Sequence, residues 1–246
     1  MLLRELQASL IITFASSKGG VGKSTSCVAL AGAYAKAGAR IHIVDLDNNR
    51  TVSRWLNDDA ARPDALTVSA PDPQLLTEHL QEAARHYAPD RILIDVAGNY
   101  ERALTVAIAR AHLTLIPAST TEADIYEAAR IAAHIQTIYA AFGKTPLFRV
   151  LAVRIATLVT HAQAHGFKEI ARLKLPLMKT IIAQRTAYEE IGLSGLPPHF
   201  ADAGRPTTAK AVAEIDQLKG EIDALLAETY GDESPPILTP AEELTA

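Results

Sequence analysis

Short apolar runs rich in branched residues alternate along this sequence with longer stretches of helical character. Seven runs have the length and composition of buried strands, at residues 10–15, 40–45, 66–69, 91–95, 113–117, 148–153 and 177–182. The longest helical stretches between and after them span residues 122–141 and 207–228. This alternation is typical of βαβ units, whose strands build a parallel sheet. The sequence therefore predicts an α/β fold with a mostly parallel, twisted sheet and helices on both faces.

The first predicted strand leads into the segment SSKGGVGKST at residues 16–25, which opens an alanine-rich helix. Glycines let successive backbone N–H groups approach phosphate oxygens, and the helix N-terminus adds a partial positive charge. A lysine at the end of such a loop bridges the β- and γ-phosphates, and the hydroxyl after it holds Mg²⁺. We therefore predict a P-loop that binds the phosphates of ATP through Gly19, Gly20, Val21, Gly22, Lys23, Ser24 and Thr25.

The loop has two unusual positions. Residue 17 is serine where the strict P-loop consensus has glycine, and an additional lysine, Lys18, stands early in the loop. The run from Lys18 to Ser24 resembles the deviant Walker A motif of the ParA/MinD family of P-loop ATPases. In that family the early lysine reaches across a dimer to the nucleotide of the partner subunit. The resemblance implies a Mg²⁺-dependent ATP hydrolase that dimerises on binding ATP, with Lys18 and Lys23 as catalytic residues.

Carboxylates stand at the ends of two of the predicted strands. Asp45 and Asp47 come at the end of the second strand, and Asp95 comes at the end of the fourth. Ligands of parallel sheets bind at the carboxyl ends of the strands, so these acids are expected beside the phosphates. Phosphoryl transfer uses Mg²⁺, held by the loop hydroxyl and a strand-end aspartate, and a group that orients the attacking water. We predict Ser24 and Asp95 as metal residues, with Asp95 acting through a metal-bound water. The resemblance implies that Asp47 is catalytic at the attacking water and that Asp45 belongs to the metal environment.

Two segments depart from the family pattern. The tripeptide NNR follows Asp47, where partition proteins commonly have Pro-Gln. Where the family often has an Asn-Arg dipeptide on the adenine side, this sequence has Val153 and Arg154. The resemblance implies that Arg154 contacts adenine, and the alternative is a loop at residues 183–185 that approaches the base through backbone groups.

The net charge of −4 conceals a separation of charge along the chain. Residues 144–185 hold eight Lys or Arg and one acid, a balance of +7, whereas the remainder carries 16 bases and 27 acids, a balance of −11. A basic segment indicates an anionic partner, and the alternative is a solvated surface. The resemblance implies that the ATP-bound dimer binds DNA without sequence preference. The candidate DNA contacts are Lys168, Arg172, Lys174, Lys179 and Arg185.

The resemblance covers about residues 10–225 and is strongest to small plasmid-partition ATPases of the ParF type. It implies a role in plasmid partition, with a second copy of the chain, DNA and a ParB-like centromere-binding protein as partners. Two alternatives stay open: an accessory ATPase of conjugative DNA transfer, and a metabolic P-loop synthetase or kinase. Metabolic P-loop enzymes generally do not need the additional lysine, so Lys18 disfavours them.

A length of 246 residues suggests one large domain or two small ones, and with 48% apolar residues the chain can bury an ample core. No repeat or low-complexity linker divides the sequence. We predict an N-terminal extension at residues 1–9, a single P-loop ATPase domain at 10–229 and a flexible acidic tail at 230–246. The single cysteine, Cys27, excludes an internal disulfide. No run approaches the ~18 apolar residues of a membrane span. We therefore expect a cytoplasmic, nucleoid-associated protein without a membrane partner, whose DNA binding comes from the ATPase surface.

Overall fold

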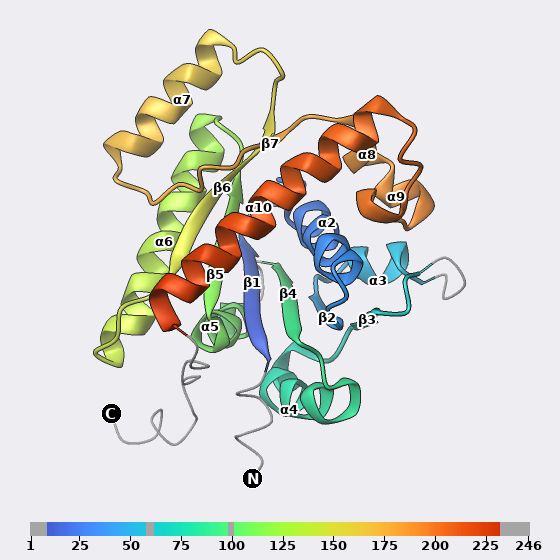
Figure 1. The fold of residues 1–246 in the computed structure, drawn as a ribbon. Helices are drawn as coiled ribbons and strands as arrows, with labels where there is room; N and C mark the ends of the chain where they lie inside the picture. The colour runs from blue at the N-terminus through green and yellow to red at the C-terminus, as the bar shows by residue number, and fades with distance from the viewer. Residues whose placement is uncertain (1–8, 58–61, 98–100, 232–246) are drawn as a thin grey trace.

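The computed structural model describes residues 9–57, 62–97 and 101–231. In this part of the chain seven parallel strands form one sheet in the order β3-β2-β4-β1-β5-β6-β7 (Figure 1). The strands are β1 (Leu10–Ser16), β2 (Ile41–Leu46), β3 (Leu66–Ser69), β4 (Arg91–Ala97), β5 (Leu113–Ala118), β6 (Phe148–Ile155) and β7 (Ile182–Ala183). The predicted α/β fold with a parallel sheet is confirmed. The predicted extension at 1–9 and tail at 230–246 lie almost entirely outside the described residues.

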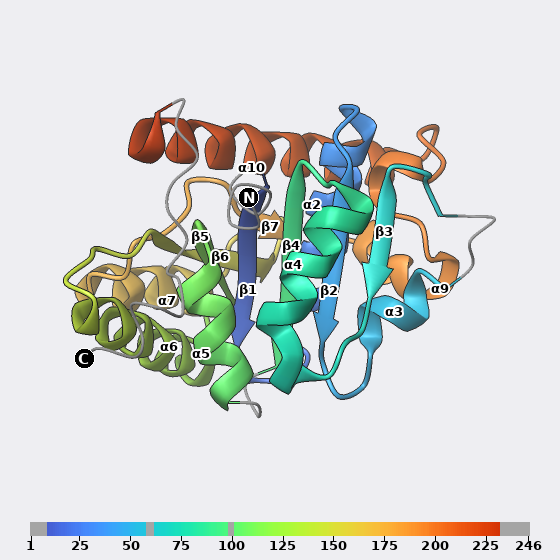
Figure 2. The same cartoon turned by 90° about the horizontal axis from the view of Figure 1, so that it is seen from below.

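Helices cover both faces of the sheet (Figure 2). One face carries α2 (Lys23–Lys36) and α10 (Pro206–Tyr230), and the other carries α4 (Leu76–Tyr87), α5 (Glu101–Arg110) and α6 (Glu122–Ala141). The shorter helical segments are α3 (Thr51–Trp55), η1 (Pro73–Leu75), α7 (His161–Arg172), α8 (Thr186–Glu189), α9 (Ile191–Ser194) and η2 (Pro198–Phe200). None of the helices in the described ranges is long and apolar enough to cross a membrane.

The central strands are apolar on both sides because helices cover both faces. In β1, Ile12 and Phe14 belong to the core beneath α2 and α10, whereas Ile11 and Ala15 belong to the core beneath α4, α5 and α6. All four side chains are fully buried. Successive side chains of a strand point to opposite faces, so each central strand supplies both cores. This arrangement explains the near-continuous apolar runs that indicated strands in the sequence.

The order of the strands brings the predicted site residues to one edge of the sheet. β1 lies between β4 and β5, so the chain passes to one side of β1 and later crosses to the other. In open α/β sheets ligands bind at such a switch point, outside the carboxyl ends of the strands. The register places Phe14 of β1 beside Asp95 of β4, and Asp95 beside Asp45 of β2.

The last strand is much shorter than the predicted strand at 177–182. Leu177 makes a single bridge with Val150, and regular pairing begins only at Ile182. Between them the backbone N–H groups of Lys179 and Thr180 donate to the carboxylate of Glu221 on α10, at 2.7 and 2.8 Å. In this interval two consecutive N–H groups thus bind a helix carboxylate and do not continue the pairing with β6.

Two predicted helices have different boundaries in the structure. The helix predicted at 158–173 begins only at His161, because Thr160 and Gln163 form a capping box that starts the helix there. The helix predicted at 186–192 divides at Glu190 into α8 and α9.

A buried histidine joins β2 to β3 and α4. His42 is fully buried, and its two ring nitrogens lie 2.8 Å from the hydroxyls of Thr67 and Ser69. The ring of Tyr87 stacks on it with 4.4 Å between centroids, and His79 reaches the Ser69 hydroxyl from α4. Burial, together with the neighbouring His79, lowers the pKa of His42 to about 3. The cluster therefore holds His42 neutral at physiological pH.

The depressed pKa of His42 predicts an acid-sensitive contribution to stability. The unfolded chain takes up the proton near a pKa of about 6.5, well before the folded chain does. The contribution is therefore complete above pH 6.5 and is lost as the pH falls toward 3, by about 1.4 kcal/mol per pH unit. Urea unfolding of His42→Gln between pH 6.5 and 5 should show a shallower dependence on pH than that of the native chain. His86→Gln, at an exposed histidine, is the control. Equal slopes of the unfolding free energy against pH for His42→Gln and the native chain would contradict this prediction.

Candidate functional site

The loop between β1 and α2 has the backbone that a phosphate site needs. Gly20 and Gly22 have φ angles of +75° and +101°, in the left-handed region where an L side chain is strained. Val21 between them is buried in the core and anchors the loop, whereas Gly19 and Gly20 are exposed and face open space. The first turn of α2 contains no acidic residue, so the partial positive charge of the helix N-terminus is not neutralised there.

Lys23 at the start of α2 is held by carboxylates from two strand ends. Its ammonium lies 2.7 Å from the Asp95 carboxylate and 3.7 Å from that of Asp47. The side chain of Lys23 is 7% exposed and that of Asp95 is fully buried. Burial disfavours the charged form of Lys23, but the two carboxylates outweigh it and raise the pKa of Lys23. The Ser24 hydroxyl donates to the other oxygen of Asp95 at 2.6 Å.

Asp45 is directed toward the backbone. It is almost fully buried, and its two oxygens accept the N–H groups of Asp47 and Ser53, at 3.1 and 2.8 Å. Burial, and repulsion from Asp95, raise the pKa of Asp45 in spite of these hydrogen bonds. The carboxylate shapes the turn between β2 and α3, and that turn carries Asp47 to the rim of the site.

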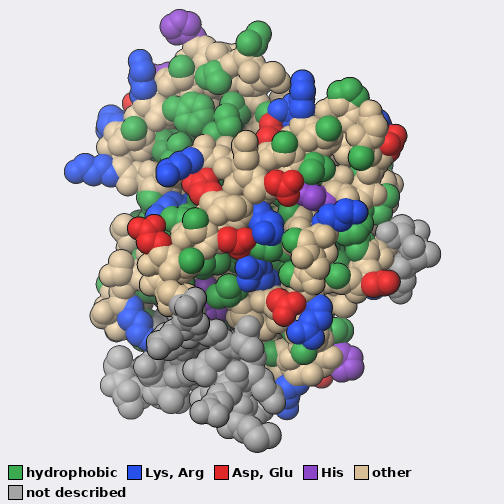
Figure 3. All heavy atoms as spheres, in the orientation of Figure 1, with side chains coloured by type: hydrophobic (Ala, Val, Ile, Leu, Met, Phe, Trp, Pro, Cys, Tyr) green, Lys and Arg blue, Asp and Glu red, His purple; other side chains and the backbone are tan. Residues whose placement is uncertain are grey.

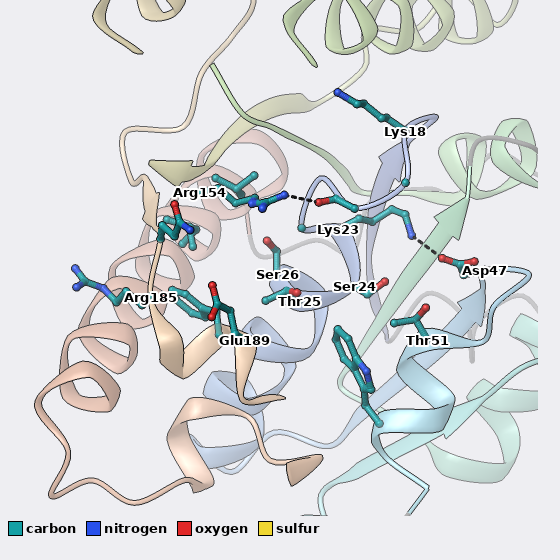
Figure 4. Close-up of a pocket in the computed structure, with 18 of the residues that line it drawn as sticks. Lys18, Lys23, Ser24, Thr25, Ser26, Asp47, Thr51, Arg154, Arg185 and Glu189 are labelled. Carbon is teal, nitrogen blue, oxygen red and sulfur yellow. Dashed lines mark hydrogen bonds and ion pairs between the residues drawn. The ribbon is translucent and has the colours of Figure 1, made fainter. Parts of the chain in front are cut away.

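A cavity of about 420 Å³ opens beside the loop (Figure 4). Lys23 and Asp47 lie at one end, and Arg185 and Glu189 lie at the other. The remaining wall comes from the loop, from α3 and from the ends of β6 and β7. Its members include Gly19, Gly20, Gly22, Ser24, Thr25, Ser26, Asn49, Thr51, Trp55, Val153, Arg154, Ile182, Ala183, Gln184 and Tyr188. The predicted P-loop residues thus surround one continuous space, apart from the buried Val21.

Arg154, predicted on the adenine side, is bound to the loop. It follows Val153 at the end of β6 with a φ of +58°, and its guanidinium donates to the carbonyl of Gly20 at 2.9 Å. A Cβ added at Gly22 would lie 3.6 Å from Val153. The end of β6 therefore braces the phosphate end of the cavity.

Lys18 also lines the cavity, but its ammonium is directed away from Lys23 and Asp47 at the phosphate end (Figure 4). Its ammonium forms an ion pair with Asp124 in the first turn of α6, and Ser119 donates to the other oxygen of Asp124. Burial disfavours ionisation of Asp124, but the bonds from Lys18 and Ser119 outweigh it and hold the pKa of Asp124 below its usual range. The neighbouring Ser17 hydroxyl donates to Glu127, also on α6. Nearly half of the Lys18 side chain is nevertheless exposed, at 46%.

The five candidate DNA contacts fall into two groups. Lys168, Arg172, Lys174 and Lys179 are exposed, and Figure 3 shows Lys and Arg side chains spaced over α7 at the upper left. Arg172 forms an ion pair with Glu169 at 2.7 Å. Arg185 is different, because its side chain is 15% exposed, lines the cavity and is paired with Glu214 of α10.

Sequence reasoning did not find Asp124 or Glu214. Asp124 lies 106 residues from Lys18, and Glu214 lies 29 residues from Arg185. Neither acid belongs to a motif, and an acidic residue in a helix is ordinarily a solvated one.

Comparison with known proteins identifies the family. The model of the VirC1 protein family matches residues 9–212. The chain belongs to the VirC1 family. A VirC1 protein of Rhizobium radiobacter is 35% identical over 127 residues, which are 48% of this chain and 52% of the relative. The chain thus matches about half the length of these curated VirC1 relatives. A ParA protein of Rhizobium radiobacter is 23% identical over 84% of this chain and 92% of its own length.

Solved structures show the same fold as this VirC1-family chain. The cell-division protein MinD of Aquifex aeolicus superposes with a TM-score of 0.67 at 20% identity, over 86% of this chain and 97% of its own. A plasmid partition protein of Borrelia burgdorferi bound to AMPPNP gives a TM-score of 0.61 at 17% identity, over 86% and 99%. The resemblance to the ParA/MinD family that the loop predicted is thus confirmed in the shared fold, and VirC1 is the family whose model the chain matches.

The Lys23–Asp95 pair predicts that the loop lysine supports the fold as well as the site. Replacing Lys23 by Met leaves a fully buried carboxylate without its cation, which costs about 3–5 kcal/mol. Lys23→Met/Asp95→Asn removes both charges and should recover most of that stability. Urea unfolding of the two variants and of the native chain measures both effects. A Lys23→Met variant as stable as the native chain would show that the pair does not stabilise the fold.

Proposed function

We propose that this chain hydrolyses ATP and uses ATP binding to switch into a dimer that binds DNA without sequence preference. The observation that carries the proposal is the buried Lys23, held between two strand-end carboxylates at the mouth of a glycine-lined cavity. A lysine so placed is matched to the β- and γ-phosphates of a nucleoside triphosphate. ATP is the first candidate because a structural neighbour, a variant of the McdA protein of Cyanothece, was solved as a complex with ATP.

The donors around Lys23 fit a nucleotide with Mg²⁺. The exposed glycines leave open space for phosphate oxygens, and the Ser24 hydroxyl and the Asp95 carboxylate are the hard oxygen donors that Mg²⁺ prefers. When bound, Mg²⁺ would neutralise negative charge on the phosphates. The MinD protein of Pyrococcus horikoshii was solved with Mg-ADP, which supports the same cofactor pair here.

Asp47 is the residue we assign to the attacking water. Its carboxylate lines the phosphate end of the cavity and keeps 17% of its surface exposed, so water can reach it. The Lys23 ammonium lies 3.7 Å from it, and a carboxylate oxygen at this place can orient a water molecule beside the phosphates. Both oxygens of the nearby Asp45 accept backbone N–H groups. We propose that Asp45 fixes the turn beside the metal site.

Lys18 is the residue we assign to the partner's active site. It stands half-exposed at the rim of the loop and is directed away from its own phosphate end. The Lys18 side chain is half-exposed, and Ser119 would still donate to the buried Asp124 carboxylate if Lys18 exchanged it for a phosphate of a second subunit. Two chains facing each other across this edge would then share two nucleotides.

Replacing Lys18 should separate binding from turnover. We expect Lys18→Ala to bind ATP within about fivefold of the native chain, because the Lys18 ammonium is directed away from the phosphate end of its own site. Steady-state hydrolysis, measured by phosphate release with and without DNA, should fall to background because the charge supplied to the partner's site is gone. Arg130→Ala is the matched control, since Arg130 is an exposed cation on the same surface. Native turnover in Lys18→Ala would reject the assignment.

The DNA surface that we propose lies on and after α7. Lys168, Lys174 and Lys179 are exposed, and Arg172, four residues after Lys168 on the same helix face, adds a paired guanidinium. A single subunit presents few such charges, and a dimer doubles them. Cations on a surface bind the phosphate backbone without reading sequence. ATP-dependent dimerisation would therefore convert a weak DNA contact into a strong one.

DNA binding should depend on nucleotide and on salt. We expect a random-sequence duplex to bind the native chain more tightly with ATP than with ADP or no nucleotide. Lys168→Ala/Lys174→Ala should weaken binding and reduce the slope of log K against log salt by about 0.9 for each DNA phosphate that the variant no longer neutralises. Fluorescence anisotropy at several salt concentrations measures both effects.

The control for that experiment is a charge-matched double variant. Lys36→Ala/Arg85→Ala removes two exposed cations from outside the basic segment and should leave DNA affinity unchanged. Equal affinity in all three nucleotide states would reject the switch, and an equal loss in the control would reject the surface.

We propose plasmid partition as the biological role, with a ParB-like centromere-binding protein as the partner that stimulates hydrolysis. The ParA relative and the plasmid partition neighbours support this role. A conjugative-transfer accessory would use the same switch on DNA. A neighbouring gene for a small DNA-binding protein beside centromere-like repeats supports partition, whereas a relaxase gene cluster supports transfer.

A further inference from the structure

One wall of the cavity is a segment that pairs with the sheet through only two residues of β7. Residues 182–189 contain the two-residue strand β7 and the single-turn helix α8. This segment faces the end of the cavity opposite Asp47 and Lys23 (Figure 4). If phosphates occupy the loop, as proposed above, the nucleobase extends toward this wall. What fixes the wall therefore decides how the base is held.

Glu214 of α10 fixes this wall through three partners. Its carboxylate accepts the Arg185 guanidinium, with the Nε donor at 2.9 Å, and the Tyr188 hydroxyl at 3.0 Å. It also receives the backbone N–H of Ala183 at 3.4 Å. Its side chain is 16% exposed, so these are shielded, charge-assisted bonds. The three partners lie at the start, middle and end of the segment.

We propose that Glu214 is a positioning residue for the nucleobase end of the cavity, and that Arg185 serves this wall and not the DNA surface. The inference rests on the proposed function, because it requires that the cavity binds ATP. Arg185 points its guanidinium at Glu214 from a largely buried position, which leaves little of it for a DNA phosphate. Tyr188 is buried and anchors α8 through the same carboxylate.

Arg154 has a separate task, at the phosphate loop. Its guanidinium is bound to the Gly20 carbonyl of the loop, so its contact supports the phosphate end. The two arginines thus divide the cavity, with Arg154 bracing the loop and Arg185 bracing the base wall. A perturbation at Glu214 should therefore affect recognition of the base and spare recognition of the phosphates.

The experiment compares ligands with and without a base. We would measure the dissociation constants of ATP, GTP and inorganic tripolyphosphate by isothermal titration calorimetry on the full chain. Glu214→Ala should weaken ATP about tenfold, the effect of removing a charge-assisted hydrogen bond. It should also reduce the preference between ATP and GTP while tripolyphosphate affinity stays unchanged. Glu214→Gln keeps an acceptor oxygen and should recover part of the ATP affinity.

Glu221→Ala is the matched control. Glu221 stands two turns further along α10 and also binds backbone N–H groups, those of Lys179 and Thr180, which do not line the cavity. It should leave all three constants unchanged. Equal losses of ATP and tripolyphosphate in both Glu214 variants, or no loss of ATP, would overturn the inference. A native chain that binds none of the ligands would instead reject the proposed function itself, and this inference with it.

Discussion

The buried ion pair between Lys23 and Asp95 joins the phosphate loop to the centre of the sheet. Asp95 sits in β4, flanked by β1 and β2, and its carboxylate binds both Lys23 and Ser24 at the start of α2. A charge removed so completely from water is tolerated only with its partner in place. The loop, the first turn of α2 and the end of β4 therefore hold one another in position before any ligand binds. Such preorganisation reduces the cost of binding a charged ligand.

The long helix α10 plays a similar part for the opposite side of the cavity. Glu214 and Glu221 are seven residues apart, close to two helical turns, so they share a side of the helix. Glu214 binds residues 183, 185 and 188 on the wall of the cavity, and Glu221 binds the stretch before them. Further along the same helix, Asp223 binds Arg91, Tyr34 and Lys219. These carboxylates therefore attach α10 by polar contacts to Arg91, to Tyr34 and to residues between 179 and 188.

The folded chain also revises the meaning of the basic segment at 144–185. Its +7 balance counts every cation equally. In the structure Arg154 is bound to the Gly20 carbonyl, Arg172 to Glu169 and Arg185 to Glu214. Arg154 and Arg172 remain exposed although paired, whereas Arg185 is largely buried. A sum of charges along a sequence therefore overstates the charge that a partner can meet, because internal pairing uses part of it.

Local patterns were enough to predict the parallel sheet, the loop at 16–25 and the meeting of Asp45, Asp47 and Asp95 at one edge. These features depend on strand periodicity, glycine conformations and the carboxyl-end rule, which act over a few residues or one βαβ unit. The length of β7, the side of the cavity that Arg185 serves and the partner of Lys18 came only from the folded chain. They depend on single carboxylates at Glu221, Glu214 and Asp124, between 29 and 106 residues away from the groups they bind. Helix packing brings such pairs together, and no local pattern records which acidic side chain will face which donor.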